Sequence, residues 1–201
     1  MLNLYLVRHG QTEWNLDKRF QGSLDSPLTE LGKEKARSLG DVLRRIKWDA
    51  IYASPLGRAH HTAEIIRGNG QQLIILKDDL KEMCFGDWEG RQYEEVGKKE
   101  PHRMEAFLQT PDTYRSTTGE DYYEVEKRAL CVLKEIVEKY PAGDVLIVSH
   151  SIVVKLIMLH LEQRDIATLW HPPEIYPASL CQVTISEGQS EIFLYGDTSH
   201  Y

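Results

Sequence analysis

Arginine and histidine side chains gather at three points of the sequence where an apolar run ends. Arg8 and His9 follow the first run and precede Gly10, Arg58 comes shortly after a second run, and His150 follows a third. Guanidinium groups bind phosphate oxygens in a bidentate way, and a histidine with a pKa of about 6.5 carries a free lone pair at neutral pH. These residue types predict a phosphate site that contains a nucleophile.

Strands and helices that alternate along the chain would bring these side chains together. Strands are expected at 2–7, 50–53, 72–76 and 144–149, a hairpin over 180–195, and helices at 29–47, 54–67, 118–140 and from 152. Thr29, Ser54 and the Thr118-x-x-Asp121 run are the expected helix starts, and the tail after Gly196 is expected to fray. This alternation indicates an α/β fold with three layers, α/β/α, around a mostly parallel central sheet. Ligands of such sheets bind beyond the carboxyl ends of the strands.

Length and charge narrow the class of protein. The 201 residues suit a single domain, 1–201, with a helical insertion at about 77–118 over the site. A net charge of −7 argues against a nucleic acid or an anionic membrane as partner. The three cysteines form no CxxC pair, which favours reduced thiols in a cytoplasmic protein.

The other histidines and the aromatic residues of the insertion are less informative. The histidines show no HExxH or similar spacing, so neither a metal nor another cofactor is expected. Trp88, Tyr93, Phe107 and Tyr114 could form a small core of the insertion or face a substrate, and the sequence leaves both readings open.

Four sequence blocks occur in one order along most of the chain. They are "RHGQTEWN" (8–15), "SPLGRAHHTA" (54–63), "KEMCFGDWEG" (81–90) and "VSHS" (148–151). Together they resemble the histidine phosphatase superfamily, the phosphoglycerate mutase-like proteins, and within it the short bacterial broad-specificity and α-ribazole phosphatases. Ser151, His61 and Asp121 stand where many members have glycine, glutamine and serine, which leaves the substrate preference open.

Phosphoryl transfer needs an attacking atom, neutralisation of the moving charge and a proton for the leaving oxygen. We assign His9 as the nucleophile, which would form a phosphohistidine, and expect a hydrogen bond from its other ring nitrogen to aim the ring. The resemblance implies that Glu82 supplies the proton, although Glu89 lies nearby in sequence. The catalytic set is therefore His9, Glu82, Arg8, Arg58 and His150. Arg8, Arg58 and His150 would also bind the substrate, and the resemblance adds Asn15, Gln21, Gly22 and Ser151 to this set.

A phosphatase is favoured over a phosphoglycerate mutase. Between Met83 and Thr118 the chain has five Lys or Arg against seven Asp or Glu, whereas a bisphosphate intermediate would call for extra cations. The prediction is a metal-independent hydrolase of small-molecule phosphate monoesters. An α-ribazole phosphate specialist, a cofactor-dependent mutase and a non-catalytic phosphate-binding protein remain as alternatives, and a homodimer stays open.

Overall fold

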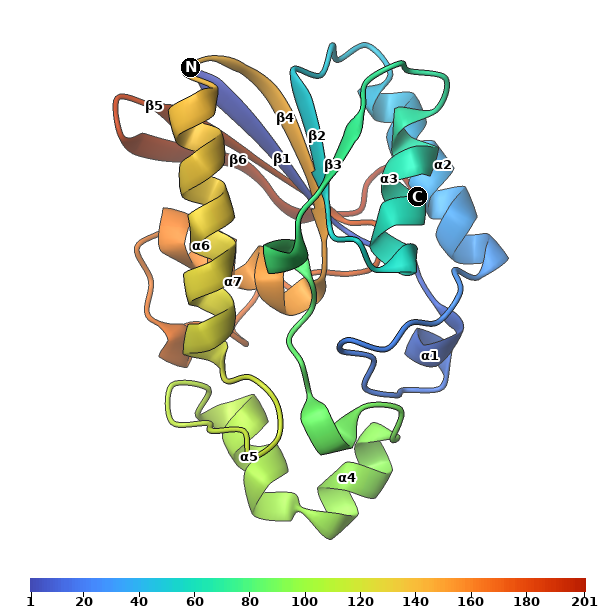
Figure 1. Cartoon of the computed structure of the whole chain (residues 1–201), viewed down its shortest axis with the longest axis vertical. Helices are drawn as coiled ribbons and strands as arrows, with labels where there is room; N and C mark the ends of the chain where they lie inside the picture. The colour runs from blue at the N-terminus through green and yellow to red at the C-terminus, as the bar shows by residue number, and fades with distance from the viewer.

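A six-stranded sheet lies at the centre of the molecule, whose computed structural model describes all 201 residues (Figure 1). The strand order is β3-β2-β4-β1-β5-β6. Four strands are parallel, namely β1 (Leu2–Arg8), β2 (Ala50–Ala53), β3 (Ile74–Leu76) and β4 (Gly143–Ser149). The other two, β5 (Leu180–Ser186) and β6 (Gln189–Asp197), form an antiparallel hairpin on one edge. The expected mostly parallel sheet is confirmed.

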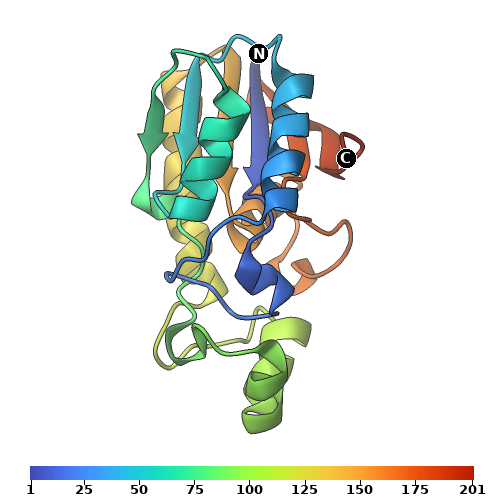
Figure 2. The same cartoon turned by 90° about the vertical axis from the view of Figure 1, so that its right-hand side faces the viewer.

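Helices cover both faces of the sheet (Figure 2). α2 (Glu30–Leu43) and α3 (Gly57–Arg67) cover one face, and α6 (Tyr122–Lys139) and α7 (Ser151–Leu161) the other. Successive side chains of β1 point to opposite faces of the sheet. Leu4 and Leu6 pack against α6 and α7. Tyr5 and Val7 pack against α2 and α3. This burial on both faces explains the continuous apolar strands and confirms the three layers.

Several predicted helix boundaries are wrong. α2 begins after the Thr29 cap as expected but ends at Leu43 rather than at residue 47. Ser54 does not cap α3, which begins at Gly57 after Leu56. The long helix α6 starts at Tyr122, and its cap is Asp121 rather than Thr118. The Asp121 carboxylate accepts the backbone N–H groups of Tyr123 and Glu124, and the Glu124 side chain accepts the Asp121 N–H in return.

The 77–118 segment lies beyond the carboxyl ends of the parallel strands (Figure 1). It contains two 3₁₀ turns, η1 (Asp78–Leu80) and η2 (Gly86–Trp88), and two helices, α4 (Tyr93–Lys99) and α5 (Pro101–Gln109). The remaining short elements are α1 (Glu13–Leu16) and η3 (Ile166–Thr168). None of the helices combines the length and the apolar character that a membrane crossing requires.

The end of the chain is packed and does not fray as expected. The Tyr201 hydroxyl donates to the carbonyl oxygen of Pro177 at 2.8 Å, and the ammonium of Lys35 lies 3.8 Å from the centre of the Tyr201 ring. His200 donates to the carbonyl of Ala178 at 3.0 Å. These contacts hold the tail against the loop that precedes β5.

Candidate active site

A cavity of about 480 Å³ opens between the carboxyl ends of the strands and the insertion. Most of the residues predicted for the site line it, namely Arg8, His9, Asn15, Gln21, Gly22, Arg58, Glu82 and Ser151. His150 does not line the cavity. It is fully buried, and its ring centre lies 5.2 Å from that of His9.

His9 follows the last residue of β1, and two contacts fix the backbone around it. The His9 N–H donates to the carbonyl of Ser149 on β4, and the Gly10 N–H donates to the hydroxyl of Thr62 on α3, both at 2.9 Å. A Cβ at residue 10 would lie 2.7 Å from the carbonyl oxygen of Gly32, so this approach of the loop to α2 requires glycine. The sheet and two helices therefore set the position of His9.

The orientation and charge of the His9 ring suit a nucleophile. Nδ1 lies 2.7 Å from the carbonyl oxygen of Gly10. Because a carbonyl only accepts, Nδ1 carries the proton and Nε2 has the lone pair. Burial, with the charges of Arg58 and Arg8 adding to it, lowers the pKa of His9 well below 6.5 and keeps the ring neutral.

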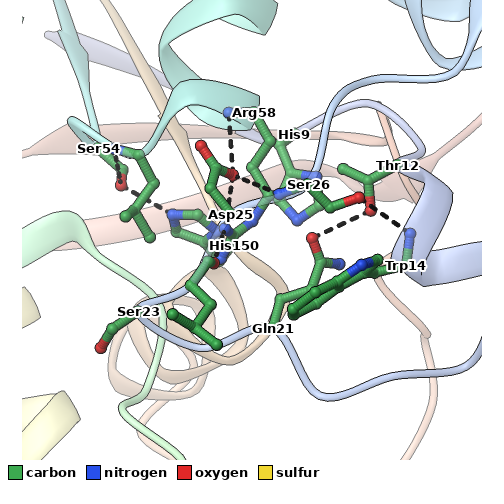
Figure 3. Close-up of polar contacts among 12 residues, drawn as sticks. His9, Thr12, Trp14, Gln21, Ser23, Asp25, Ser26, Ser54, Arg58 and His150 are labelled. Atoms are coloured by element: carbon green, nitrogen blue, oxygen red, sulfur yellow. Dashed lines mark hydrogen bonds and ion pairs between the residues drawn. The ribbon is translucent and has the colours of Figure 1, made fainter. Parts of the chain in front are cut away.

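His150 lies between the last residue of β4 and the first residue of α7, and its ring is held by Ser54, the expected start of α3. Its Nε2 lies 2.8 Å from the hydroxyl oxygen of Ser54 (Figure 3). Burial, then the charges of Arg58, His9 and Arg8, lower the pKa of His150 well below 6.5. The buried Nδ1 of His150 has no partner in the chain. If the Ser54 hydroxyl donates to Nε2, the neutral ring carries its proton on Nδ1 and can donate it to a ligand.

Arg58 is clamped by the loop at residues 22–25. Its Nη2 donates to the carbonyl of Gly22 at 2.8 Å, and its Nη1 donates to the carbonyl of Leu24 at 2.7 Å. Nη1 also donates to the Asp25 carboxylate at 2.9 Å (Figure 3). The guanidinium is fully buried, so these bonds fix its plane. Gly57 accommodates the clamp, since a Cβ there would lie 2.5 Å from Asp25.

Three buried nitrogen atoms of the site have no hydrogen-bond partner in the chain: Nε of Arg8, Nε of Arg58 and Nδ1 of His150. Arg8 is otherwise fixed by its Nη1, which donates to the carbonyl of Ile175 at 2.7 Å. Unpaired buried donors are costly, and a concentration of them beside one imidazole marks a site for an anion.

Glu82 faces the cavity from the segment between η1 and η2. One carboxylate oxygen accepts the N–H of Met83 at 3.0 Å. Burial raises the pKa of Glu82, although the Met83 N–H and the charges of Arg58, Arg8 and Arg128 act in the opposite direction. The residue is only 7% exposed, and this burial favours the protonated form of the carboxyl over the charged one.

The backbone that carries Glu82 is anchored to the body of the protein. Arg128 on α6 donates to the carbonyls of Lys81 at 2.6 Å and Glu82 at 3.1 Å. The Ser149 hydroxyl donates to the carbonyl of Leu80 at 2.7 Å. Glu89, the nearby alternative, is occupied elsewhere, because one of its carboxylate oxygens accepts the N–H groups of Ser23 and Phe85.

The comparison with known families agrees with this geometry. Residues 4–198 match the histidine phosphatase superfamily (branch 1). The chain belongs to this family. Its fold resembles the structure of YhfR from Bacillus stearothermophilus with a TM-score of 0.96 and 38% identity, over 100% of this chain and 99% of the other.

Two bacterial phosphatases are similar to this chain in sequence over most of its length. The uncharacterized phosphatase PhoE of Bacillus subtilis is 33% identical over 92% of this chain and 87% of its own length. The adenosylcobalamin/α-ribazole phosphatase of Escherichia coli is 29% identical over 85% of this chain and 84% of its own. The expected relationship to the short bacterial phosphatases is confirmed.

Several cavity residues of this histidine phosphatase had no signal in the sequence. Trp170, in the loop after η3, lines the cavity, and its indole N–H donates to the carbonyl of Phe107 at 2.8 Å. The same carbonyl accepts the Tyr122 hydroxyl at 2.9 Å. Phe107 and Tyr93 also line the cavity, whereas Trp88 and Tyr114 are fully buried and do not. The insertion aromatics therefore serve both of the roles that the sequence left open.

The first loop forms the polar side of the cavity. The Thr12 hydroxyl contacts the side-chain oxygen of Gln21 at 3.0 Å (Figure 3). It also contacts that of Asn15 at 3.1 Å. Asn15 also accepts the Thr12 N–H at 3.0 Å, which completes the capping box of α1. Ser151 lies on the opposite side, with its hydroxyl 3.4 Å from a carboxylate oxygen of Glu82. Two amide side chains are thus held in fixed orientations beside the cations.

Proposed function

We propose that the chain hydrolyses phosphate monoesters through a phosphohistidine on Nε2 of His9. The observation that carries this proposal is the set of three unpartnered buried nitrogens beside a neutral, oriented imidazole. Arg8, Arg58 and His150 would hold the non-bridging oxygens and stabilise the charge of the transition state. Asn15, Gln21, Gly22 and Ser151 would line the path of the substrate.

Glu82 acts in both half-reactions of the proposed mechanism. As the Nε2–P bond forms and the P–O bond to the leaving group breaks, protonated Glu82 gives its proton to the leaving oxygen. The resulting carboxylate then takes a proton from water as the water oxygen attacks phosphorus. The P–N bond breaks and orthophosphate is released. A raised pKa suits the first of these steps, and this role favours an enzyme over a non-catalytic binding protein.

The leaving group meets an apolar wall. From the insertion, Phe85, Tyr93, Met104, Phe107 and Leu108 line the cavity, and no lysine or arginine does. Arg91 and Arg103 are paired with carboxylates of the same segment. Only Arg19 could bind a second phosphate, so the lining favours hydrolysis of monoesters with an apolar leaving group over mutase chemistry.

The decisive experiment is trapping of the phosphoenzyme from a ³²P-labelled monoester, with a quench in alkaline detergent because phosphohistidine hydrolyses in acid. We expect label on the native protein and on the control His61→Ala, which changes an exposed histidine of α3. His9→Ala is expected to carry no label and to lose at least about a thousandfold in kcat. Label retained by His9→Ala would overturn the proposal.

Metal independence is the second part of the proposal, because the guanidinium groups of Arg8 and Arg58 already supply the positive charge that a metal would contribute. Release of orthophosphate from p-nitrophenyl phosphate is therefore expected to be unchanged after dialysis against EDTA. Loss of activity that added divalent cations restore would contradict it.

A further inference from the structure

The largest hollow of the molecule lies away from the catalytic cavity. It has a volume of about 810 Å³, and it is formed where α2 and α3 end, together with the loops that lead from them into β2 and β3. We name it the α2–α3 groove, lined among others by Arg37, Arg44, Lys47, Trp48 and Arg67. It therefore lies at the amino ends of the parallel strands, opposite the proposed active site (Figure 2).

The charge of the groove is opposite to that of the protein. Four cationic side chains line it, Arg37, Arg44, Lys47 and Arg67, against the single carboxylate of Asp41. The whole chain has a net charge of −7. A concentration of positive charge in an acidic protein creates a local potential that attracts anions.

Three of these four cations are also free of hydrogen-bond and ion-pair partners. Arg37, Arg44 and Lys47 form no ion pair and no side-chain hydrogen bond. Arg67 donates from Nη1 to the carbonyl of Gln72 at 3.3 Å, and its buried Nε has no partner. The C-terminal ends of α2 and α3 carry partial negative charge, which favours nearby cations. None of the four cations, however, donates to a carbonyl in the last turn of its helix. Stabilisation of the helix ends therefore does not by itself explain why these four cations lie together.

We propose that the α2–α3 groove binds a phosphate chain, either a linear polyphosphate or the triphosphate of a nucleotide. Several charges spread along one ligand match four separated cations, and guanidinium groups bind phosphate oxygens well. Exposed pairs contribute little singly, so a multiply charged ligand is required. Trp48, whose ring is held edge-to-face by Tyr5 at 5.1 Å, offers an aromatic surface for a base.

The test follows the indole N–H signal of Trp48 in ¹⁵N–¹H spectra, assigned through Trp48→Phe. Tripolyphosphate and ATP are titrated separately into full-length His9→Ala, which prevents turnover, with excess orthophosphate present to occupy the catalytic cavity. A saturable shift of the signal is expected with at least one of the two. Equal affinities would identify the phosphate chain as the ligand, and tighter binding of ATP would identify a nucleotide.

Reversing two of the positive charges of the α2–α3 groove tests whether the ligand binds there. Arg44→Glu with Lys47→Glu is expected to weaken binding at least about tenfold. The matched control, Lys127→Glu with Lys139→Glu, reverses two exposed cations on α6 that form no ion pair, and it is expected to leave the affinity unchanged. Both doubles are also made in the His9-containing protein, where unchanged hydrolysis of p-nitrophenyl phosphate reports correct folding.

Two results would overturn the proposal: a Trp48 signal that neither ligand shifts, or the same loss of affinity in both double variants. If the reversal variant does not fold, Arg44→Gln with Lys47→Gln replaces it, with about a threefold to fivefold weaker affinity expected. The shift of the Trp48 signal and the affinities report binding directly, whereas the folding readout and the use of His9→Ala rest on the proposed phosphatase activity.

Discussion

The floor and the wall of the catalytic cavity are built in different ways. Arg8, His9, Arg58 and Glu82 form the floor, and each is fixed by hydrogen bonds to backbone or carboxylate groups. Phe85, Tyr93, Phe107 and Trp170 contribute the wall, which rests mainly on contacts between aromatic rings. Ring contacts tolerate a change of shape better than a charge-assisted bond tolerates a change of angle. The floor should therefore determine the reaction, and the wall should determine which leaving groups are accepted.

The largest effect is expected from the acid of the floor. Glu82→Gln should reduce the single-turnover rate of phosphoryl transfer by about a hundredfold to ten-thousandfold for alkyl phosphates, whose leaving oxygen needs a proton. The loss should be smaller for p-nitrophenyl phosphate, since its leaving group is stable as an anion. Equal losses on both substrates would show that Glu82 is not the proton donor.

The same variant should change the pH profile. Because the pKa of His9 lies well below 6.5, the ring remains neutral, and active, well below that pH. Because the pKa of Glu82 is raised above 4.5, the carboxyl is protonated at low pH and the rate falls as pH rises through this raised value. Single-turnover rates in Glu82→Gln should lack the descending limb. A limb that persists would belong to another group.

Removing the negative charge of Asp25, which pairs with Arg58, should lower kcat/KM by an intermediate amount. Asp25→Asn keeps the size of the side chain but removes the charge that pairs with the buried guanidinium, so kcat/KM should fall about tenfold on every substrate. Glu64→Gln on α3 is the control, because that carboxylate forms no ion pair. A loss confined to bulky substrates would assign Asp25 to the wall instead.

The smallest effect is expected at the wall. Trp170→Phe keeps an aromatic ring but removes the hydrogen bond to Phe107, which should raise KM about fivefold for aryl phosphates and leave kcat unchanged. Glycerol phosphate, which has no aromatic group, serves as the comparison substrate and should be unaffected. A fall in kcat on both substrates would remove the distinction between floor and wall.

The residues of the floor could be predicted from the sequence more completely than those of the wall, for a physical reason. Arg8, His9 and His150 occur directly at strand ends, where a parallel sheet brings distant segments together, and the resemblance supplied Glu82. The carbonyl partners of Arg58 come from a loop more than thirty residues earlier, and no local pattern indicates such a contact.

The wall and the element boundaries depend on tertiary packing. Trp170 lies in an irregular loop, and its bond to Phe107 joins residues 63 positions apart. Ser54 follows a strand and precedes a proline, which is typical of a helix cap, yet its hydroxyl pairs with His150, 96 residues later. Thr118 had the spacing of a helix start, but its hydroxyl donates to Asp87 instead. Both residues have a high propensity to cap a helix, but in both cases the hydroxyl forms a hydrogen bond with a residue far away in the sequence instead.

The Phe107 carbonyl, which accepts both Trp170 and Tyr122, joins α5 to α6 and to the loop before β5 at one point. We expect a wall joined in this way to stay in place during the proposed reaction, so that orthophosphate leaves without an opening motion. Turnover limited by chemistry rather than by a closing motion is insensitive to the viscosity of the solvent.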